Sequence, residues 1–309
     1  MNGKRVLVTG GAGFIGSNLA NHLAADNDVV ALDNGYLGTP ENLEAGVEYV
    51  EADVLDDDLP TDVDVVVHLA ALSSLTMHEE STDNLRRGAR VNVEGFVNTV
   101  DQARQEGCET VVYASTSSIY GDRTEPSPES MDVEARTGYE ASKLARERYG
   151  EYFHNYHGMA VAGLRFFSVY QGYGGAEEHK GEYANIIAQF ADDIANGRSP
   201  TIYGDGTHKR DFTHVEDIVR GIELVADHRL TGIYNLGTGE QYTANEVVEL
   251  INTELGTDVE PEHVENPIPE HAFVEATLAD PSKVRAATGW EPRIGFEEGI
   301  ERVCRQYTD

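Results

Sequence analysis

Tyr139 and Lys143 are the two residues in this sequence whose types and spacing could move a proton. On a helix, a spacing of four residues places both side chains on one face. An ammonium beside a phenol favours phenolate and lowers the tyrosine pKa from about 10 toward neutrality. A base of that strength suits the oxidation of an alcohol. The hydroxyl-rich segment 114–121 ends an expected strand and offers a hydrogen-bonding partner for the same substrate oxygen.

A glycine-rich turn comes much earlier, where an apolar strand runs into a helix-patterned segment over residues 6–24. Gly10, Gly13 and Gly16 allow a tight turn and a close backbone approach to a pyrophosphate. The helix that follows presents free N–H groups to the phosphates. A second apolar strand ends in Asp33 about 20 residues on, where the dinucleotide fingerprint has an acid for the ribose hydroxyls. The sequence therefore predicts a dinucleotide site.

The charge balance restricts the partners of the protein. Of its 309 residues, 55 are acidic and 23 are basic, which gives a formal net charge of −32. This balance repels nucleic acid and anionic membranes, so we expect neither as a partner. Because the acids are scattered along the chain, we interpret them as a solvated surface suited to high salt. The hypothesis is a halophilic source.

Cysteines and apolar runs indicate the compartment. Cys108 and Cys304 are too few for a disulfide framework or a cysteine-ligated zinc site, so no metal is expected. No signal-type segment precedes the first strand, and the longest apolar run, residues 63–72, is shorter than the ~20 residues of a membrane helix. We expect a cytoplasmic protein.

Strands and helices alternate along the first half of the chain, which predicts an α/β fold with a doubly wound parallel sheet of Rossmann type. We expect a dinucleotide-binding domain over residues 1–167 with returns near 211–236, and a smaller, interleaved substrate lobe over 168–309. The expected strands are 47–51, 63–71, 110–115, 160–167 and 232–236, and the expected helices are 84–106, 139–156, 184–196, 243–255 and 280–289.

The chain resembles extended short-chain dehydrogenase/reductases of the nucleotide-sugar epimerase/dehydratase family over essentially its whole length. It is most like the UDP-glucose 4-epimerases of that family. The resemblance is carried by residues 9–16, 68–71, 92–95, 115–121, the Tyr139 and Lys143 pair, 164–170 and 209–215.

This resemblance implies the roles of the site residues. Tyr139 is the catalytic base, Lys143 binds the nicotinamide ribose and tunes Tyr139, and Thr116 is the hydroxyl partner. The implied cofactor is NAD, because Asp33 would repel a 2′-phosphate, although some family members with an acid there take NADP. The implied cofactor-binding residues are Gly10, Gly13, Phe14, Ile15, Gly16, Asp33, Asn34, Asp53, Val54, Leu69, Ala70, Ala71, Tyr139 and Lys143.

Two serines indicate which reaction of the family the resemblance implies. Dehydratases of the family follow the catalytic threonine with an Asp-Glu pair, whereas this chain has Ser117 and Ser118. Without those acids, elimination lacks its proton donor. The resemblance thus implies epimerisation of a nucleotide-diphosphate sugar, first of all UDP-glucose to UDP-galactose at C4 through a transient keto-sugar. A different nucleotide-sugar epimerase, a net oxidoreductase and a non-enzymatic NAD-binding sensor are the alternatives.

The expected substrate-binding residues come from several segments. Arg210 resembles the ligand of the nucleotide diphosphate, since a guanidinium binds phosphate oxygens in bidentate fashion. Tyr203 could stack on the base and Asn185 could bond to it, although both residue types are more often structural. Ser168 stands where the family usually has a diphosphate-contacting asparagine. Ser73 and Thr116 complete the set.

Lys180 lies in a Glu-His-Lys-Gly stretch that resembles a segment of ADP-glyceromanno-heptose 6-epimerases, in which the lysine is a second acid/base. It is therefore a candidate catalytic residue, the alternative being a solvated loop lysine. Family members often dimerise through the helix that carries the tyrosine. Tyr149, Tyr152, Phe153 and Tyr156 could supply contact area for a homodimer, or pack in the core.

The halophile hypothesis predicts a salt response. We expect the melting temperature to rise as KCl is raised from about 0.1 M to about 1 M, because the Debye length falls from about 10 Å to about 3 Å and self-repulsion is screened. Thermal unfolding followed by circular dichroism measures this, with sucrose as an uncharged control for solvent exclusion. Maximal stability at low salt would contradict the hypothesis.

Overall fold

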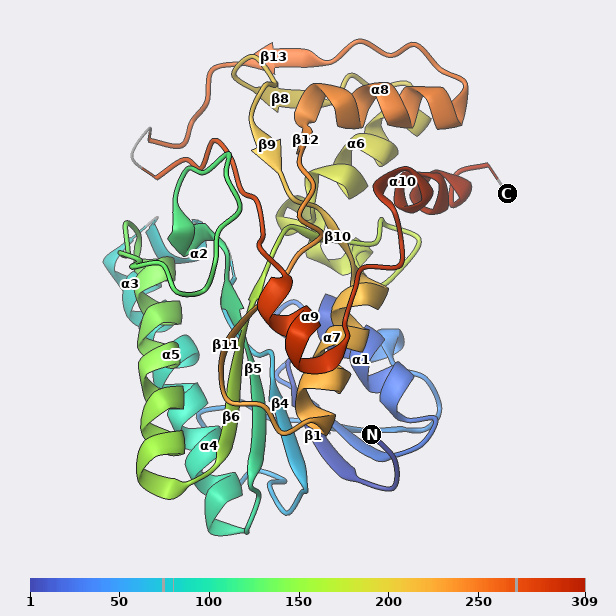
Figure 1. Cartoon of the computed structure of the whole chain (residues 1–309). Helices are drawn as coiled ribbons and strands as arrows, with labels where there is room; N and C mark the ends of the chain where they lie inside the picture. The colour runs from blue at the N-terminus through green and yellow to red at the C-terminus, as the bar shows by residue number, and fades with distance from the viewer. Residues whose placement is uncertain (74–75, 80, 270–271, 309) are drawn as a thin grey trace.

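The computed structural model describes residues 1–309 except 74–75, 80, 270–271 and 309. Its centre is a seven-stranded parallel sheet with the strand order β11-β6-β5-β4-β1-β2-β3 (Figure 1). This order confirms the predicted doubly wound fold, since the sheet grows outward in both directions from β1 and β4. The strands are β1 (Arg5–Thr9), β2 (Asp28–Asp33), β3 (Val47–Glu51), β4 (Val65–His68), β5 (Thr110–Thr116), β6 (Ala160–Phe166) and β11 (Gly232–Leu236).

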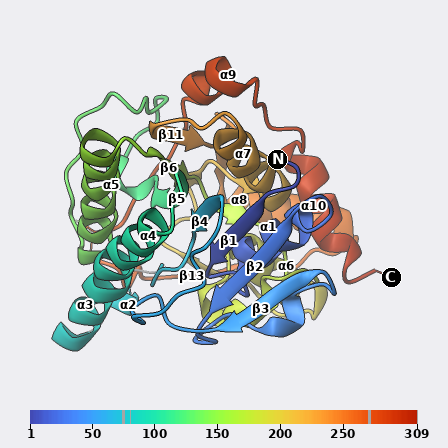
Figure 2. The ribbon, with the colours of Figure 1, turned by 90° about the horizontal axis from the view of Figure 1, so that it is seen from below.

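Helices cover both faces of the sheet, as a parallel sheet with buried strands requires. Seen from below, α1 and α7 lie on one side of the sheet and α4 and α5 on the other (Figure 2). The helices are α1 (Phe14–Leu23), α2 (Thr76–Glu79), α3 (Thr82–Ala89), α4 (Gly95–Gln105), α5 (Gly138–His157), α7 (Val215–Asp227) and α9 (Ser282–Thr288). Within the described ranges, no helix is both long and apolar enough to cross a membrane.

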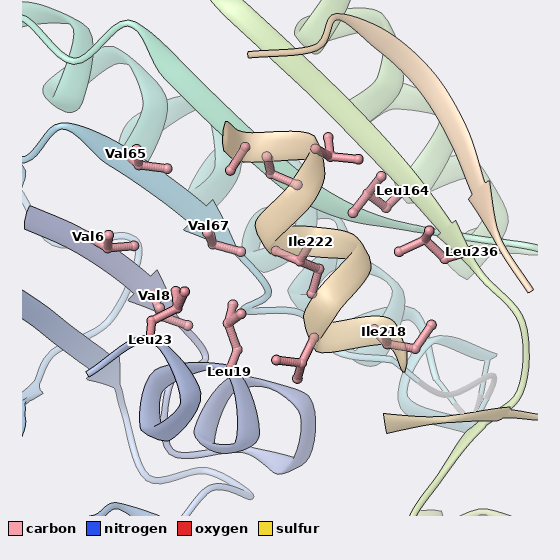
Figure 3. Close-up of a cluster of buried hydrophobic side chains, with 14 of the residues drawn as sticks. Val6, Val8, Leu19, Leu23, Val65, Val67, Leu164, Ile218, Ile222 and Leu236 are labelled. Carbon is pink, nitrogen blue, oxygen red and sulfur yellow. The ribbon is translucent and has the colours of Figure 1, made fainter. Parts of the chain in front are cut away.

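The alternation of side chains along each strand builds one apolar core on each face. Val6 and Val8 of β1 point toward α1 and α7, where Leu19 and Ile222 are fully buried against them (Figure 3). Leu7 points the other way and joins the second core with α4 and α5. Because both faces are filled, the strands are fixed in register and their carboxyl ends meet at one edge.

A smaller lobe sits above that edge, at the top of Figure 1. It consists of short strand pairs packed with three helices around an apolar cluster that includes Ile187, Ile251 and Ile300. The pairs are β7 (Val169–Tyr170) with β10 (Thr213–His214), β9 (Lys209–Arg210) with β12 (Tyr242–Thr243), and β8 (Thr201–Tyr203) with β13 (Glu262–Val264). The helices are α6 (Ile186–Ala195), α8 (Ala244–Leu255) and α10 (Phe296–Arg305). Among the described residues, the 3-10 helices are η1 (Pro40–Asn42), η3 (Ser118–Tyr120) and η4 (Glu178–Tyr183), the last with a kink at Gly181.

One expected helix is interrupted. The segment predicted as a helix over 84–106 contains a π-helical turn, η2 (Arg90–Glu94), between α3 and α4. Periodicity of apolar residues does not reveal a π turn, whose extra residue leaves the flanking helices amphipathic. Asn92 lies in this turn, and its side chain bonds both backbone groups of Leu72.

The sequence predicts that Thr243 and Glu246 open the helix at 243–255, and that Asp280 caps the helix at 280–289, which Gly289 ends. The structure confirms the first cap and moves the second by one residue. Thr243 and Glu246 form the reciprocal capping box that opens α8. At α9 the N-cap is Pro281 and not Asp280, although the Asp280 carboxylate still accepts a bond from the Ser282 amide at 3.0 Å. Gly289 ends that helix in the left-handed conformation, as expected.

Asp211 connects the two lobes through hydrogen bonds. Its carboxylate is fully buried and accepts bonds from the Thr238 amide and hydroxyl at 2.8 Å, the Gly239 amide at 2.9 Å and the Ala279 amide at 3.0 Å. Burial raises the pKa of Asp211, and these donors oppose the rise. One carboxylate thus joins the segment next to Arg210 with the loop after β11 and the late segment near 279.

Replacing Asp211 by Asn should lower the free energy of unfolding by about 2–4 kcal/mol, because an amide N–H would face backbone donors in a buried site. Urea denaturation of the two proteins measures the difference. Asp205→Asn is the matched control, since its carboxylate caps Thr207 in an exposed turn. Equal losses for the two variants would contradict the role given to Asp211.

Candidate active site

A cavity of about 810 Å³ lies at the carboxyl ends of the central strands, beneath the smaller lobe. Its walls come from the glycine turn, the ends of β2, β4, β5 and β6, helices α3 and α5, and η4. This is the edge where ligands bind in open α/β sheets. The fold therefore brings the glycine turn, Tyr139 and Lys143 to one cavity.

The glycine turn is held by close backbone contacts. Gly10 has a φ of +68°, and a Cβ there would lie 2.8 Å from the Ala70 nitrogen. A Cβ on Gly16 would lie 2.0 Å from the Gly10 carbonyl oxygen. Helix α1 begins after Gly13 with no side-chain cap, so its first N–H groups are not taken by a side chain. The turn thus has the open backbone and the helix N-terminus that suit a pyrophosphate.

Asp33 is held at the end of β2. Its carboxylate accepts bonds from the Ala12 amide at 3.2 Å and the Gly35 amide at 3.0 Å. Burial raises the pKa of Asp33, and the backbone donors oppose this rise. Asn34 donates to Asp53 at 2.9 Å, which joins the two expected adenosine contacts. The residues present therefore fit the adenosine half of a dinucleotide.

Tyr139 projects from the first turn of α5 into the cavity. Burial raises its pKa, and the hydrogen bond with Thr116, followed by the charge of Arg146, opposes the rise. Thr116 ends β5 and also contacts the Ser118 hydroxyl at 3.1 Å. The structure thus brings the phenol and the expected hydroxyl partner together.

Lys143 lines the cavity one turn after Tyr139. Its ammonium nitrogen donates to the Ala114 carbonyl at 3.2 Å and lies 5.6 Å from the centre of the Tyr139 ring. Burial and the charge of Arg146 hold the pKa of Lys143 well below its usual value. The expectation that Lys143 lowers the Tyr139 pKa stays a prediction, and burial of the amine acts against the charged form that this role needs.

Most of the predicted site residues line the cavity. They are Gly10, Gly13, Phe14, Ile15, Gly16, Asp33, Asn34, Asp53, Val54, Leu69, Ala70, Ala71, Ser73, Thr116, Tyr139, Lys143, Ser168 and Lys180. Ser168 has a positive φ of 25°, an uncommon conformation for a serine at the mouth of a site. The structure does not bring Asn185, Tyr203 or Arg210 to the cavity wall.

Those three residues lie in the upper lobe. The Asn185 side chain caps α6 by accepting from the Ile187 amide and also donates to the Val169 carbonyl, so its polar groups are used by the fold. Tyr203 is 42% exposed on β8. Arg210 donates to the Lys209 and Glu275 carbonyls, and burial lowers its pKa to about 10.

Several cavity residues were missed from the sequence. Arg86, Arg87 and Arg90 line the cavity near Asn34, and the Arg87 guanidinium lies 4.1 Å from the centre of the Tyr36 ring. No motif identifies them, since the arginines of a polar helix usually face solvent. Arg146 was missed although its position, three residues after Lys143, puts it on the same face of α5.

Lys180 reaches the cavity from η4. Its nitrogen lies 3.9 Å from a carboxylate oxygen of the buried Glu177 and 5.2 Å from the centre of the Phe14 ring. Burial lowers the pKa of Lys180, and Glu177 opposes the change. The neighbouring His179 contacts Asn42, which also donates to the Ala12 carbonyl of the glycine turn. Lys180 is thus a partly buried cavity residue and not a solvated loop lysine.

Comparison with known proteins agrees with this geometry. The family model described as the NAD dependent epimerase/dehydratase family matches residues 6–237. The chain belongs to this family. A UDP-glucose 4-epimerase of Mycolicibacterium smegmatis is 33% identical over 313 residues, which covers 97% of each chain.

Solved structures of family members superpose on the whole chain. A UDP-N-acetylglucosamine 4-epimerase from Methanobrevibacter ruminantium, in complex with UDP-N-acetylmuramic acid, is 30% identical with a TM-score of 0.89 and covers 100% of this chain and 99% of its own. A UDP-glucose 4-epimerase of Thermus thermophilus, in complex with NAD, is 31% identical with a TM-score of 0.86 and covers 98% and 99%. The chain is an enzyme of this family, and its cofactor is NAD.

Lys180→Ala tests the expected acid/base role. We expect kcat to fall by at least about tenfold while the affinity for NAD is kept, because a lost proton donor acts on turnover. Lys4→Ala, which removes an exposed lysine paired with Asp64 at the opposite end of β1, is the control. Wild-type kinetics would contradict the role, and a loss of NAD affinity alone would assign Lys180 to cofactor binding.

Proposed function

We propose that the protein is an epimerase of nucleotide-diphosphate sugars that inverts C4 of a UDP-hexose, with UDP-glucose and UDP-galactose as the first pair. The observation that carries this proposal is the meeting of Thr116 and Tyr139 with the glycine turn in one cavity. A sugar alcohol held against Tyr139 would share this cavity with a dinucleotide held at the glycine turn. The relatives with C4-epimerase names support the same reaction class.

The acids of the cavity support epimerisation over elimination. Among the described residues that line it, the carboxylates are Asp33 and Asp53, both at the adenosine end. Ser117 and Ser118 follow Thr116, and the Ser118 hydroxyl contacts Thr116. Elimination of water needs a proton donor for the departing hydroxyl. We call the part of the cavity lined by Thr116, Tyr139, Lys143 and Lys180 the reaction end. These four residues supply hydroxyl, phenol and amine groups in place of acids.

Each residue of the reaction end has a proposed part. Tyr139 takes the proton of the C4 hydroxyl and later returns it. Thr116 hydrogen-bonds the same oxygen and favours the phenolate form of Tyr139. Lys143 bonds the end of β5 through the Ala114 carbonyl and holds the nicotinamide ribose. Bound NAD would supply the hydride acceptor, and then the hydride donor, for C4 of the sugar.

The nucleotide diphosphate is assigned to the upper lobe. Arg210 lies 5.6 Å from the centre of the Phe273 ring, and His208 packs against that ring edge-on. Burial, followed by the charge of Arg210, lowers the pKa of His208 to about 4. A cationic guanidinium among aromatic rings is suited to a phosphate next to a nucleobase. Tyr203 and Ser168 remain proposed substrate contacts.

Incubation with UDP-glucose and no added electron acceptor tests the function. We expect NMR to show UDP-galactose, and Tyr139→Phe to lower kcat by at least about 100-fold because the proton acceptor is lost. Tyr149→Phe, an exposed tyrosine on the same helix, is the control and should retain activity.

A panel of UDP-, ADP-, GDP- and dTDP-sugars, followed by NMR for changed stereochemistry, identifies the sugar and the nucleotide. Inversion of another sugar would correct the substrate and keep the reaction class. Stoichiometric accumulation of NADH would indicate a net oxidoreductase. Binding of NAD with no change in any sugar would indicate a sensor and overturn the proposal.

We also propose a homodimer formed through α5. Tyr149, Tyr152 and Tyr156 are 42%, 45% and 75% exposed, and the rings of Tyr152 and Tyr156 stack at 5.6 Å. Phe153 was expected among them, but it is buried in the core on Phe96 because it points to the other face of the helix.

Sedimentation velocity at high salt should show a dimer at micromolar concentration, and Tyr149→Glu with Tyr156→Glu should shift it to monomer because charges would be buried in the interface. Tyr203→Glu, an equally exposed tyrosine on β8, is the control. A monomeric wild-type chain would remove the proposal.

A further inference from the structure

His78 is a fully buried histidine of α2 that touches the ring of Tyr139 from inside the protein. The centres of the two rings lie 5.5 Å apart with their planes at 65°, which is the edge-on contact that aromatic rings prefer. Tyr139 lines the cavity, whereas His78 is not one of the described residues that do. The contact therefore supports Tyr139 from the side opposite the substrate.

The side chain of Asn92 sets the state of the His78 ring. The Leu72 amide donates to Asn92 Oδ1 at 2.9 Å, and Asn92 Nδ2 donates to the Leu72 carbonyl at 3.0 Å, so these two bonds identify the nitrogen end of the amide. That nitrogen lies 3.3 Å from His78 Nε2. An amide nitrogen is a donor, so His78 Nε2 accepts and carries no proton. The ring beside Tyr139 is thus neutral.

Asn92 also holds the backbone of Tyr139. Its Nδ2 donates to the Ser142 hydroxyl at 2.9 Å, and that hydroxyl donates to the Tyr139 carbonyl at 2.7 Å. One buried amide therefore orients His78, which contacts the Tyr139 ring, and Ser142, which bonds the Tyr139 backbone. Ring and backbone of Tyr139 are supported from the same point.

Gly88 provides the space that the His78 ring occupies. A Cβ on Gly88 would lie 2.2 Å from His78 Cδ2 and 2.3 Å from Nε2, closer than atoms can approach. Gly88 is the buried residue of α3, and α2 and α3 both lie beside α5 (Figure 1). A glycine within a helix is destabilising relative to alanine. The glycine at this position is explained by the ring that fills its place.

We propose that His78 is a positioning residue for the epimerisation: seated in the space left by Gly88, it holds the ring of Tyr139 toward Thr116 and the cavity. The inference rests on the proposed function, in which Tyr139 exchanges a proton with the sugar. Proton transfer needs the phenol within hydrogen-bond reach of the sugar hydroxyl, and a misplacement of about 1 Å can cost about 100-fold in rate. Without His78 the phenol ring has room to tilt away.

A double-mutant cycle on His78 and Gly88 tests the proposal through the kinetics of epimerisation. We expect His78→Ala to lower kcat at least about tenfold with little change in KM, because the phenol moves while the other substrate contacts stay. Gly88→Ala should do the same, since its added methyl group displaces the ring. In the double variant that methyl group enters the space the ring has left, so kcat should equal that of His78→Ala alone.

Thermal unfolding of the same proteins separates positioning from filling of space. The double variant should melt higher than His78→Ala, because a methyl group occupies part of the gap and a helix gains an alanine, while its kcat stays low. Recovery of kcat together with the melting temperature would overturn the proposal in favour of a purely structural role. Gly221→Ala is the matched control: it lies in α7, on the other face of the sheet from α5, and its Cβ would lie 2.7 Å from Leu236. It should lower the melting temperature and keep kcat.

A spectroscopic measurement reports the Tyr139 ring without turnover. The full chain is labelled with 3-fluorotyrosine, and the ¹⁹F NMR signal that disappears in Tyr139→Phe is assigned to Tyr139. His78→Ala and Gly88→Ala should shift this signal, and Gly221→Ala should not. His78→Gln, which keeps an acceptor for Asn92 and loses the ring, takes the place of His78→Ala if that protein does not fold.

Two further results would overturn the inference: an unchanged Tyr139 signal when the His78 ring is removed, or wild-type kcat in that protein. A further loss of kcat from Gly88→Ala in the His78→Ala background would also contradict it, because the two changes would then act independently. If the wild type epimerises no sugar, the proposed function fails, and the ¹⁹F signal still decides whether His78 holds Tyr139.

Discussion

The contact of α1 with the turn that precedes it is the constraint on which the rest of the structure depends. At Gly16 there is no room for a Cβ, because the Gly10 carbonyl would lie 2.0 Å away. This approach sets the start of α1 at Gly13 and the position of the Ala12 amide that bonds Asp33. The glycine turn therefore fixes both the phosphate end and the ribose end of the proposed NAD site.

The opposite wall of the cavity depends on polar groups instead of close packing. Arg146 and Lys143 bond the Ala114 carbonyl, and Glu147 holds both the Ser115 hydroxyl and Arg165. Residues 143–147, little more than one turn of α5, thus hold the end of β5, where Thr116 lies. Buried hydrogen bonds of this kind are costly to break, so they hold the reactive groups in place where mobile loops would not.

The fold and much of the site could be predicted because their signals are local. Apolar runs mark β4 and β5, Thr243 and Glu246 mark a helix start, and glycine spacing marks the turn. The π turn at Asn92 could not be predicted, since it depends on the fit of α3 and α4 to Leu72. The lowered pKa of Lys143 could not be predicted either, because it depends on burial and on the charge of Arg146, neither of which residue spacing reveals.

Charge divides the molecule into a repelling surface and an attracting cavity. The chain as a whole has a net charge of −32, yet among its described residues the cavity is lined by Arg86, Arg87, Arg90, Lys143 and Lys180 against the two carboxylates Asp33 and Asp53. A dinucleotide and a nucleotide-diphosphate sugar are both anions, so the acidic surface repels them and the cavity attracts them. Salt screens exposed charges more strongly than buried ones. In concentrated salt the surface repulsion therefore falls away, while the attraction at Lys180, whose side chain is only 21% exposed, is screened less.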